Sequence, residues 1–430
     1  DSYVRTICKG GSIKRALKID FSAGVNFSKE NFDFTVNAIS EIIATFWKNR
    51  ITLVKFGRLF SKNFLRNIAR LEYTKTLEDV AKTVSKPLLV LGAGEGLDTL
   101  SYSSFSPNDF FIITVDAALS PLLARNITPD AVVTMESQIA IEKTFLGAKN
   151  KNILLFADLC ARPEATKILG GNIIWFATKY ADGIFFDNLK KESVIRNFIE
   201  PMGSVGLAAT YIALKIRSSS SIPVFIAGLD FSYSIGTTHA KDTMALKQRF
   251  INSNRLTPIE NYDAAFSMST QTVMSKNGKK ICSTKILLQY AQQFKLMFQN
   301  EKNLFDCSST GIKLGIPQRN LFAIKGNLQK EKCESHKNIS SFCEKEKRKL
   351  EELRSLLSDG EKSPFRNNLP EKLSLSKQIK KIAEEREYLF LHFPDGYAFK
   401  IDQSFLKRIR AETDFFIKQL EIAMKENKPL

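Results

Sequence analysis

The chain has 430 residues, which is too many for one compact core, so its length predicts two or three domains. Apolar residues make up 43% and aromatic residues 10%, values that indicate a globular chain and exclude a disordered one. No apolar run approaches the roughly 18 residues that a membrane-spanning helix needs, so we expect no transmembrane segment. The formal net charge of +18 indicates an anionic partner, with a solvated basic surface as the alternative.

The start of the chain and the spacing of its cysteines indicate the cellular compartment of the protein. The chain begins with Asp1 and has no signal-peptide pattern, and the absence of Met at position 1 indicates that an upstream part of a longer chain is missing. Its six cysteines are scattered without the spacing of a disulfide framework, which is typical of a reducing compartment. We therefore expect a cytoplasmic protein.

The sequence of residues 1–84 indicates an N-terminal region of mixed or mostly helical structure. Between Glu41 and Glu72 there is no acidic residue, and five basic residues recur there at helical spacing. The functional interpretation is a docking surface for an acidic protein, a phosphate-rich ligand or an anionic membrane, and the alternative is a solvated helix face. The five residues of this basic face are Lys55, Arg58, Lys62, Arg66 and Arg70.

Residues 85–320 alternate between short apolar runs and helix-compatible stretches such as "ALSPLLARN" and "GLAATYIALKIR". Buried strands separated by helices predict an α/β fold: a Rossmann-like, doubly wound, mostly parallel sheet. The predicted strands are "LLVLG", "FFIITVD", "AVVTM", "NILLFAD", "NIIWFAT" and "PVFIAGLD".

Beyond residue 320 the composition changes. Residues 321–370 are charged and poor in β-branched residues, which predicts a helical or flexible connector. Residues 371–430 predict a C-terminal helical region with two amphipathic helices, one marked by Leu375, Ile379 and Ile382 and the other by apolar residues from 405 to 420.

The first predicted strand runs into a glycine-rich loop, Gly92-Ala93-Gly94-Glu95-Gly96. Glycine lets a backbone come close to a phosphate, and a following helix start points its amides at an anion. The third glycine of the dinucleotide fingerprint is replaced by Leu97, so the loop suits a nucleotide phosphate but not a conventional dinucleotide. A tight turn without a ligand is the alternative.

Polar residues also follow the other predicted strands, at the sheet edge where ligands of such folds bind. Asp230 ends a very apolar strand, a costly place for an unpartnered carboxylate, which favours a functional role. Asp116 and the Gly203-Ser204 turn could equally be helix caps, and His239 lies in a hydroxyl-rich loop where a structural role is an equal alternative. The candidate residues beyond the glycine loop are Asp116-Ala117-Ala118, Glu136-Ser137, Gly203-Ser204, Asp230 and His239.

Two groups of residues could hold a metal ion. Cys333, His336 and Cys343 offer three soft ligands without a fourth at zinc spacing, so free thiols are the preferred interpretation. The four carboxylates after the strands could hold a hard cation if they converge, so a metal site stays unknown. These carboxylates are Asp116, Asp130, Glu136 and Asp230.

Three motifs in this order resemble the core of the motility-associated factor (Maf) flagellin glycosyltransferases, which is shared with 6-hydroxymethylpterin diphosphokinase MptE-like proteins. They are "LGAGEGLDTL", "IITVDAALSPLLARNITPDAVVTMESQ" and "MGSVGLAATYIALKIRSSSSIPVFIAGLDFSYSIGTTHAKDT", which together cover roughly residues 85–320. The third, at 203–243, is the most specific.

The resemblance implies transfer of a nonulosonic, sialic-acid-like sugar from its CMP-activated form to Ser or Thr of flagellin. The implied partners are the CMP donor and flagellin, with or without its chaperone, and no nucleic acid. No cofactor beyond the donor is required, although Mg²⁺ is an alternative. Two other functions stay open: pyrophosphoryl transfer from ATP to a pterin, and a non-catalytic flagellin-binding protein of the same fold.

His239 is the predicted general base, with Asp230 orienting substrate hydroxyls or the imidazole. An imidazole pKa near 6.5 suits removal of a serine proton at neutral pH. Of the three histidines, His239 alone falls in the predicted core.

Overall fold

The computed structural model describes residues 17–19, 23–100, 106–149, 151–169, 172–258, 267–322, 339–362, 369–396 and 398–426. The chain forms two compact units. Unit 1 consists of residues 1–69, 179–196 and 338–428, and unit 2 of residues 70–178, 197–337 and 429–430. Neither unit is a consecutive range, so the four ranges expected from the sequence describe the order of elements along the chain rather than the compact units.

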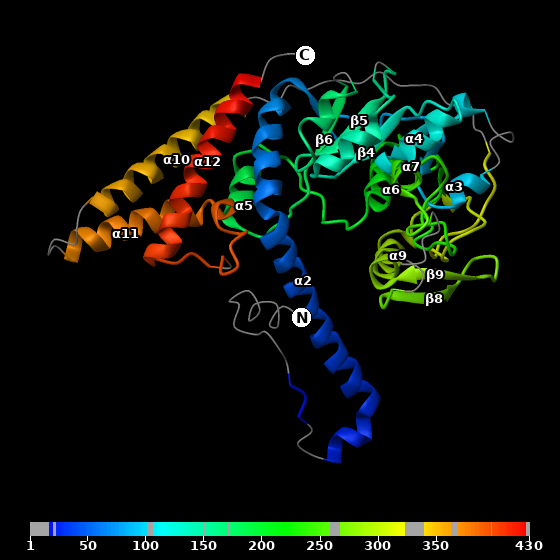
Figure 1. Cartoon of the computed structure of the whole chain (residues 1–430), viewed down its shortest axis with the longest axis horizontal. Helices are drawn as coiled ribbons and strands as arrows, with labels where there is room; N and C mark the ends of the chain where they lie inside the picture. Colours follow the sequence, from blue (N-terminus) through cyan, green and yellow to red (C-terminus); the bar gives the residue numbers. More distant parts are fainter. Residues whose placement is uncertain are drawn as a thin grey trace. The chain divides into compact units, whose positions relative to one another are not determined.

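Unit 2 is built on an eight-stranded parallel sheet with the strand order β1-β6-β5-β4-β3-β2-β7-β10 (Figure 1). The chain adds β2 to β6 in one direction and then crosses to the other side of β2, which confirms the predicted doubly wound α/β fold. The strands are β1 (Lys75–Thr76), β2 (Leu88–Leu91), β3 (Phe111–Val115), β4 (Ala131–Thr134), β5 (Leu154–Asp158), β6 (Ile173–Phe176), β7 (Val224–Ala227) and β10 (Leu304–Asp306).

The central strands are apolar throughout because both faces of the sheet are covered. All four residues of β2 are inaccessible to solvent, as are all four of β7. Leu88 pairs with Phe111 of β3 on one side and with Val224 of β7 on the other. All six strands expected from apolar runs are present, whereas the short edge strands β1 and β10 were missed.

The helices of unit 2 connect these strands. Helix α6 packs against β2, β3, β4 and β7, and α4 packs against β3 and β4. In the described residues between β7 and β10 lie the hairpin β8–β9 and the helices α7 and α9. These elements are α3 (Gly96–Thr99), α4 (Asp116–Ala124), α6 (Val205–Ile216), α7 (Met244–Asn252), β8 (Thr270–Met274), β9 (Lys280–Thr284) and α9 (Lys285–Phe298).

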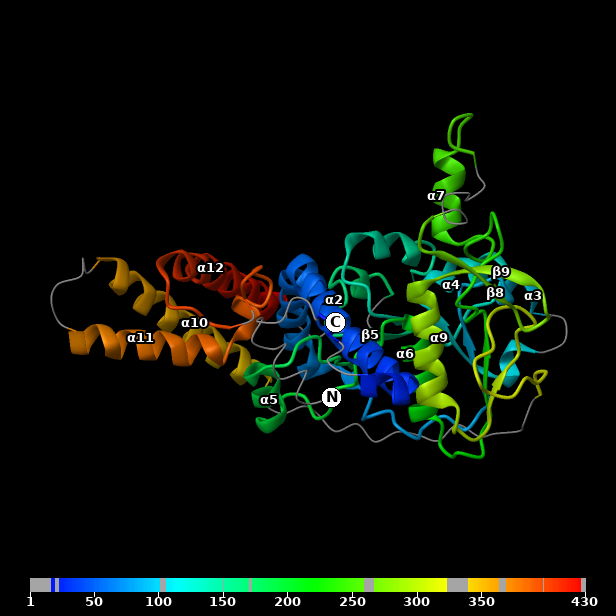
Figure 2. The same ribbon diagram turned by 90° about the horizontal axis from the view of Figure 1, so that it is seen from below.

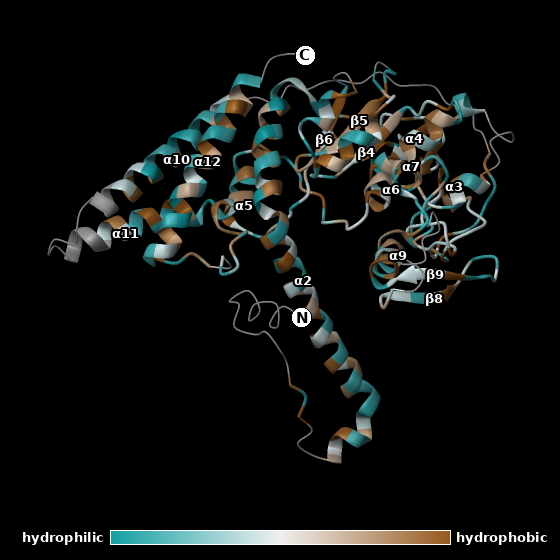
Figure 3. Cartoon of the chain, viewed as in Figure 1, coloured by the Kyte–Doolittle hydropathy of each residue, from teal (hydrophilic) through white to brown (hydrophobic). Residues whose placement is uncertain are grey.

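Unit 1 is helical. Its long helix α12 packs against both α2 and α10, and α10 also packs against α11. Apolar and polar residues alternate along these helices at helical spacing (Figure 3), and the apolar face of α12 supplies buried Phe405, Ile409 and Phe416. The helices are α2 (Lys29–Ile68), α5 (Ile184–Lys191), α10 (Ile339–Lys362), α11 (Leu369–Glu384) and α12 (Gln403–Glu426). None of the helices in the described ranges is long and apolar enough to cross a membrane.

The predicted basic face is largely occupied by contacts within the chain. Arg58 forms an ion pair with Glu412 at 2.8 Å, and Arg66 pairs with Glu426 at 3.0 Å. Arg70 lies beyond the end of α2, where it donates a hydrogen bond to Thr166 Oγ1. Acidic residues of α12 thus neutralise two of the five cations of this face, and its role as a docking surface stays a prediction.

Unit 1 contains a buried polar group between α10 and the segment that follows α11. Arg386 pairs with Glu346 at 2.9 Å, and both side chains are less than a tenth exposed. The hydroxyl of Tyr388 donates a hydrogen bond of 2.6 Å to the other oxygen of Glu346. One carboxylate thus satisfies two buried donors, and removing it would leave a buried guanidinium uncompensated.

We expect Glu346→Ala to lower the free energy of unfolding by about 3–5 kcal/mol, because the buried cation of Arg386 loses its partner. The matched control is Glu344→Ala on the same helix, whose pair with Arg348 is solvent-exposed and is worth at most about 1 kcal/mol. Urea unfolding followed by circular dichroism measures both variants. Equal losses in the two would contradict the stabilising role of the buried pair.

Candidate functional site

The glycine-rich loop after β2 is tightly bound to the loop after β7. The amide of Gly92 donates to the Ala227 carbonyl at 2.8 Å, and that of Gly94 donates to the Gly228 carbonyl at 2.9 Å. A Cβ atom at Gly92 would collide with the Gly228 backbone, and Gly228 itself has a φ of 71°. Glycine is required at both positions by this close approach of two backbones.

Asp230 closes the glycine loop from the side of β7. Its Oδ2 accepts a hydrogen bond of 2.6 Å from the amide of Gly96, the first residue of α3. The side chain is almost fully buried, and burial raises its pKa to about 6 despite the Gly96 amide and the nearby charge of Lys276. The carboxylate of Asp230 therefore accepts the hydrogen bond of the Gly96 amide, which was predicted from the sequence to bind a phosphate.

Further buried charges lie behind this loop. Lys276 and Asp306 form an ion pair whose side chains are 2% and 3% exposed, and Glu95 accepts hydrogen bonds from the amide and hydroxyl of Ser234. Lys276 and Asp306 were not among the site residues predicted from the sequence. Asp306 ends a short apolar strand just as Asp230 follows one, so the same strand-end signal would have identified it.

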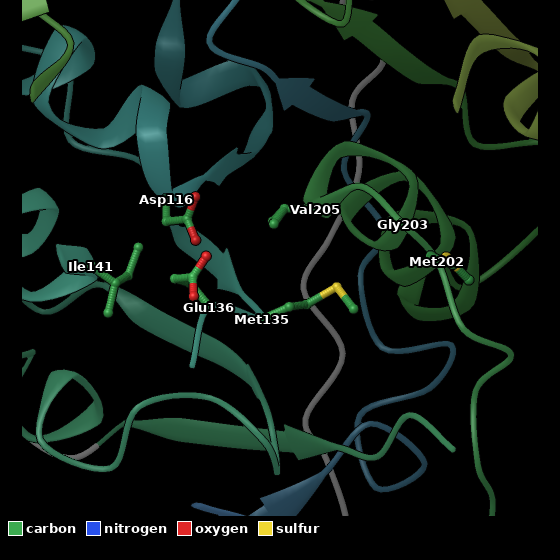
Figure 4. Close-up of a pocket in the computed structure, with 7 residues that line it drawn as sticks. All are labelled: Asp116, Met135, Glu136, Ile141, Met202, Gly203 and Val205. Atoms are coloured by element: carbon green, nitrogen blue, oxygen red, sulfur yellow. The ribbon is translucent and has the colours of Figure 1, made fainter. Parts of the chain in front are cut away.

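A cavity of about 260 Å³ opens beside this loop, at the carboxyl ends of β3 and β4 and the start of α6. Figure 4 shows two carboxylates, those of Asp116 and Glu136, directed toward each other on one side of the cavity. The backbone at Gly203 and Val205 borders the other side. The lining residues are Asp116, Met135, Glu136, Ile141, Met202, Gly203 and Val205.

Asp116 is the most constrained side chain of the cavity. Its Oδ1 accepts a hydrogen bond from the Ala117 amide at 2.7 Å, and its Oδ2 accepts one from the Thr134 hydroxyl at 2.8 Å. Burial raises the pKa of Asp116 to about 6, the two hydrogen bonds oppose this, and the charge of Glu136 adds to the rise. The position can therefore exchange a proton near neutral pH.

Glu136 in the cavity lining and Ser204 at the start of α6 each accept a hydrogen bond from a residue two positions further along the chain. Glu136 Oε1 accepts a hydrogen bond from the Gln138 amide at 2.8 Å. Ser204 caps α6, because its hydroxyl accepts a hydrogen bond from the Gly206 amide at 3.2 Å. The twelve-residue helix α6 begins at the cavity wall, so the positive end of its dipole and its first amides lie there.

His239 lies over the glycine loop, because the neighbouring amide of Ala240 donates to the Ala93 carbonyl at 2.8 Å. Its Nδ1 is 3.1 Å from the hydroxyl of Thr238. Burial, and then the charge of Arg249, lower the pKa of His239. Neither His239 nor Asp230 lines the cavity, and no hydrogen bond joins the two within the described ranges.

The candidate carboxylates do not converge on one metal site. Asp130 lies at the opposite end of the sheet, where its Oδ2 accepts a hydrogen bond from the Ile112 amide near the start of β3. Asp230 is hydrogen-bonded to the glycine loop, which leaves Asp116 and Glu136 together. Among the described residues, no three metal-ligating side chains form a group. Cys333 and His336 lie outside the described residues, and Cys343 is a buried cysteine of α10.

The predicted site residues thus fall into two groups. Asp116, Glu136 and Gly203 share the cavity, with Ser204 capping the adjoining helix and Ala117 donating to Asp116. The residues of the glycine loop and Asp230 form the second group. Ala118 and Ser137 are buried beside the cavity residues. Thr134 and the apolar lining of Met135, Ile141, Met202 and Val205 were missed, although Thr134 ends its strand directly before Met135-Glu136.

The family model described as 6-hydroxymethylpterin diphosphokinase MptE-like matches residues 62–236. These residues include β2 to β7, the glycine loop and the whole cavity lining. The match confirms the MptE-like core that the sequence motifs predicted.

Relatives of known sequence and structure were also found. A Treponema pallidum protein described as uncharacterized is 31% identical over 95% of this chain and 74% of its own length, and a second from the same organism is 26% identical over 54% of this chain and 47% of its own. The structure of the Maf glycosyltransferase from Magnetospirillum magneticum AMB-1 matches with a TM-score of 0.46 and 14% identity, over 86% of this chain and 61% of that one. The chain therefore belongs to the family of the first Treponema pallidum protein, with an MptE-like domain at its core.

Proposed function

We propose that this protein is a glycosyltransferase that moves a nonulosonic sugar from a CMP-activated donor to a Ser or Thr hydroxyl of flagellin. The observation that carries the proposal is the cavity in which Asp116, with a pKa of about 6, faces the start of α6. This arrangement offers a proton acceptor and an anion-binding helix end in one small cavity. The donor and acceptor classes come from the motif resemblance of the sequence.

The phosphate of the donor would lie at the start of α6. The backbone at Gly203 and Val205 borders the cavity, and since the Gly206 amide already donates to Ser204, the Val205 amide at the first position of α6 would donate to the phosphate. In the glycine loop, by contrast, the amides of Gly94 and Gly96 donate to protein oxygens. A single phosphate at α6 fits a CMP donor, which has no pyrophosphate to place along a longer groove.

Asp116 would accept the proton of the acceptor hydroxyl as the sugar is transferred. A carboxylate whose pKa is about 6 is mostly ionised at pH 7 and remains basic enough to take up a proton. Its hydrogen bonds with Ala117 and Thr134 hold the carboxylate in place. Glu136 would stabilise the positive charge that develops on the sugar ring as the CMP group leaves.

A divalent cation fits this site only with help from the substrate. Asp116 and Glu136 are two oxygen ligands, and Mg²⁺ is commonly held by one or two carboxylates together with substrate phosphates and water. When bound, it would neutralise charge on the donor phosphate. The roles of Asp116 and α6 described above do not depend on it.

A second candidate function is pyrophosphoryl transfer from ATP to a pterin. The description of the matching family, a 6-hydroxymethylpterin diphosphokinase, favours it. The apolar lining of Met135, Ile141 and Met202 suits a flat ring of either a pterin or a cytosine. A non-catalytic flagellin-binding protein is the third alternative, and ligand binding distinguishes all three.

We expect isothermal titration to detect binding of CMP in the absence of metal and no binding of ATP with Mg²⁺. Val205→Phe should weaken CMP binding at least about tenfold, because the larger side chain fills the cavity beside the phosphate. The matched control is Val273→Phe in the hairpin strand β8, outside the cavity. Binding of ATP–Mg²⁺ alone would favour the pterin reaction, and binding of neither nucleotide would favour the non-catalytic alternative.

Asp116→Asn should lower the rate of sugar transfer about 10²- to 10⁴-fold and leave CMP affinity within a few-fold of wild type, because only the proton acceptor is lost. Intact mass of flagellin incubated with CMP-pseudaminic or CMP-legionaminic acid measures the transfer. The comparison variant is His239→Ala, which removes the base predicted from the sequence. A larger loss in His239→Ala than in Asp116→Asn would assign the base to His239.

The pH profile gives an independent readout of Asp116. A base acts in its ionised form, so kcat/KM should fall as the pH is lowered through about 6 and level off above it. Since the unperturbed carboxyl pKa is 3.8, an exposed carboxylate would shift this fall to a much lower pH. The residual activity of Asp116→Asn should lack the transition. A transition that persists unchanged in this variant would show that another group titrates.

A further inference from the structure

Helix α7 and its flanking residues form an arm, defined here as residues 241–256, between β7 and the hairpin β8–β9. None of the nine residues of α7 is buried. In Figure 2 the helix projects away from the sheet of unit 2. A helix this short is not stable by itself in water, and one that buries no residue gains little from packing. A contribution to the stability of unit 2 therefore does not explain the residues found in α7.

The apolar side chains of the arm are exposed. Phe250 is 56% exposed, Ile251 81% and Leu256 91%. Single exposed apolar residues need no explanation, but here three lie within seven residues, two of them on the projecting helix and Leu256 just beyond its end. Such a group of exposed apolar residues is typical of a surface that another molecule covers.

The charge of the arm is basic and uncompensated. The arm contains one acidic residue, Asp242, and four basic residues, Lys241, Lys247, Arg249 and Arg255. In the part of the chain that the structure describes, none of these four side chains pairs with a carboxylate, and Nη1 of Arg249 is buried without a hydrogen-bond partner. In contrast, Arg58 and Arg66 of α2 are paired with acidic residues of their own unit. Of these four cations, Lys241 and Arg255 are exposed, and their charge complements an acidic partner.

The base of the arm is attached next to the cavity. Ser120 donates a hydrogen bond of 3.0 Å to the carbonyl of Asp242, and Lys247 Nζ donates one of 3.2 Å to Ser120 Oγ. Ser120 lies four residues after Asp116 on α4, about one helical turn from the proposed base. The base of the arm is thereby attached to the helix that carries Asp116.

We propose that the arm is the docking site for the acceptor protein, through an acidic segment that carries apolar side chains. The proposal rests on the proposed transfer to a protein hydroxyl and adds the surface that selects the acceptor. A protein segment fits better than a membrane, because the base of the arm is attached to α4, the helix that begins with Asp116. Three exposed apolar residues and two exposed cations also match the size of a peptide contact, not of a broad interfacial helix.

Two double variants test the arm: Phe250→Ser with Ile251→Ser, and Lys241→Gln with Arg255→Gln. All four side chains are exposed, so the fold should be retained. The matched controls are Leu296→Ser, which is 65% exposed on α9, and Lys302→Gln. Each protein is assayed for sugar transfer to flagellin, for hydrolysis of the CMP donor without acceptor, and for flagellin binding by biolayer interferometry at low and physiological salt.

We expect both arm variants to raise the KM for flagellin and its Kd at least about tenfold, with donor hydrolysis within about twofold of wild type. The charge variant should also slow association and flatten its salt dependence. The control variants should behave as wild type. Because donor hydrolysis does not involve the acceptor, it reports on the proposed function separately from docking.

Transfer with an unchanged flagellin KM and Kd in both arm variants would overturn the docking role while leaving the proposed function intact. Absence of both hydrolysis and transfer in the wild type would instead overturn the proposed function, and flagellin binding would then decide the docking role alone. Binding of the wild type, but not of the arm variants, to phosphatidylglycerol vesicles with no flagellin binding would assign the arm to a membrane and contradict the proposal.

Discussion

The close approach of β2 and β7 determines how unit 2 is built. The two backbones come together at Gly92 and Gly228, where a side chain on either residue would collide with the backbone of the other. Next to this contact, Asp230 accepts a hydrogen bond from the amide of Gly96. The interaction ties the first and the last half of the sheet together at the point where the strand order reverses. It also positions the chain after β7, whose loop contacts the glycine loop and leads into α7.

This constraint explains why the cavity lies over β3 and β4. The amides of Gly94 and Gly96 donate to protein oxygens, whereas the first residues of α6 lie at the cavity. The same cavity receives Asp116 and Glu136 from two neighbouring strand ends. Burial, and to a smaller extent repulsion from Glu136, favour the protonated form of Asp116 and raise its pKa to about 6.

Charge is used differently in the two units. In unit 1, carboxylates of α10 and α12 neutralise arginines of α2 and Arg386, so charged side chains contribute to packing between helices. In the arm of unit 2, cations of similar number are left without carboxylate partners in the described part of the chain. The net charge of +18 therefore identifies a basic protein, but only the contacts distinguish internally neutralised cations from those available to a partner.

Local patterns in the sequence determined the fold class and six of its strands, because apolar runs of four or five residues between helices require a sheet covered on both faces. They also identified Asp116, Glu136 and Gly203 as strand-end or helix-start residues. Only the tertiary structure decided that these three share a cavity, that Asp230 binds the glycine loop, and that Arg58 and Arg66 pair with α12. Such partners lie from tens to hundreds of residues apart in the sequence, and their contacts depend on strand order and helix packing, which no local pattern encodes.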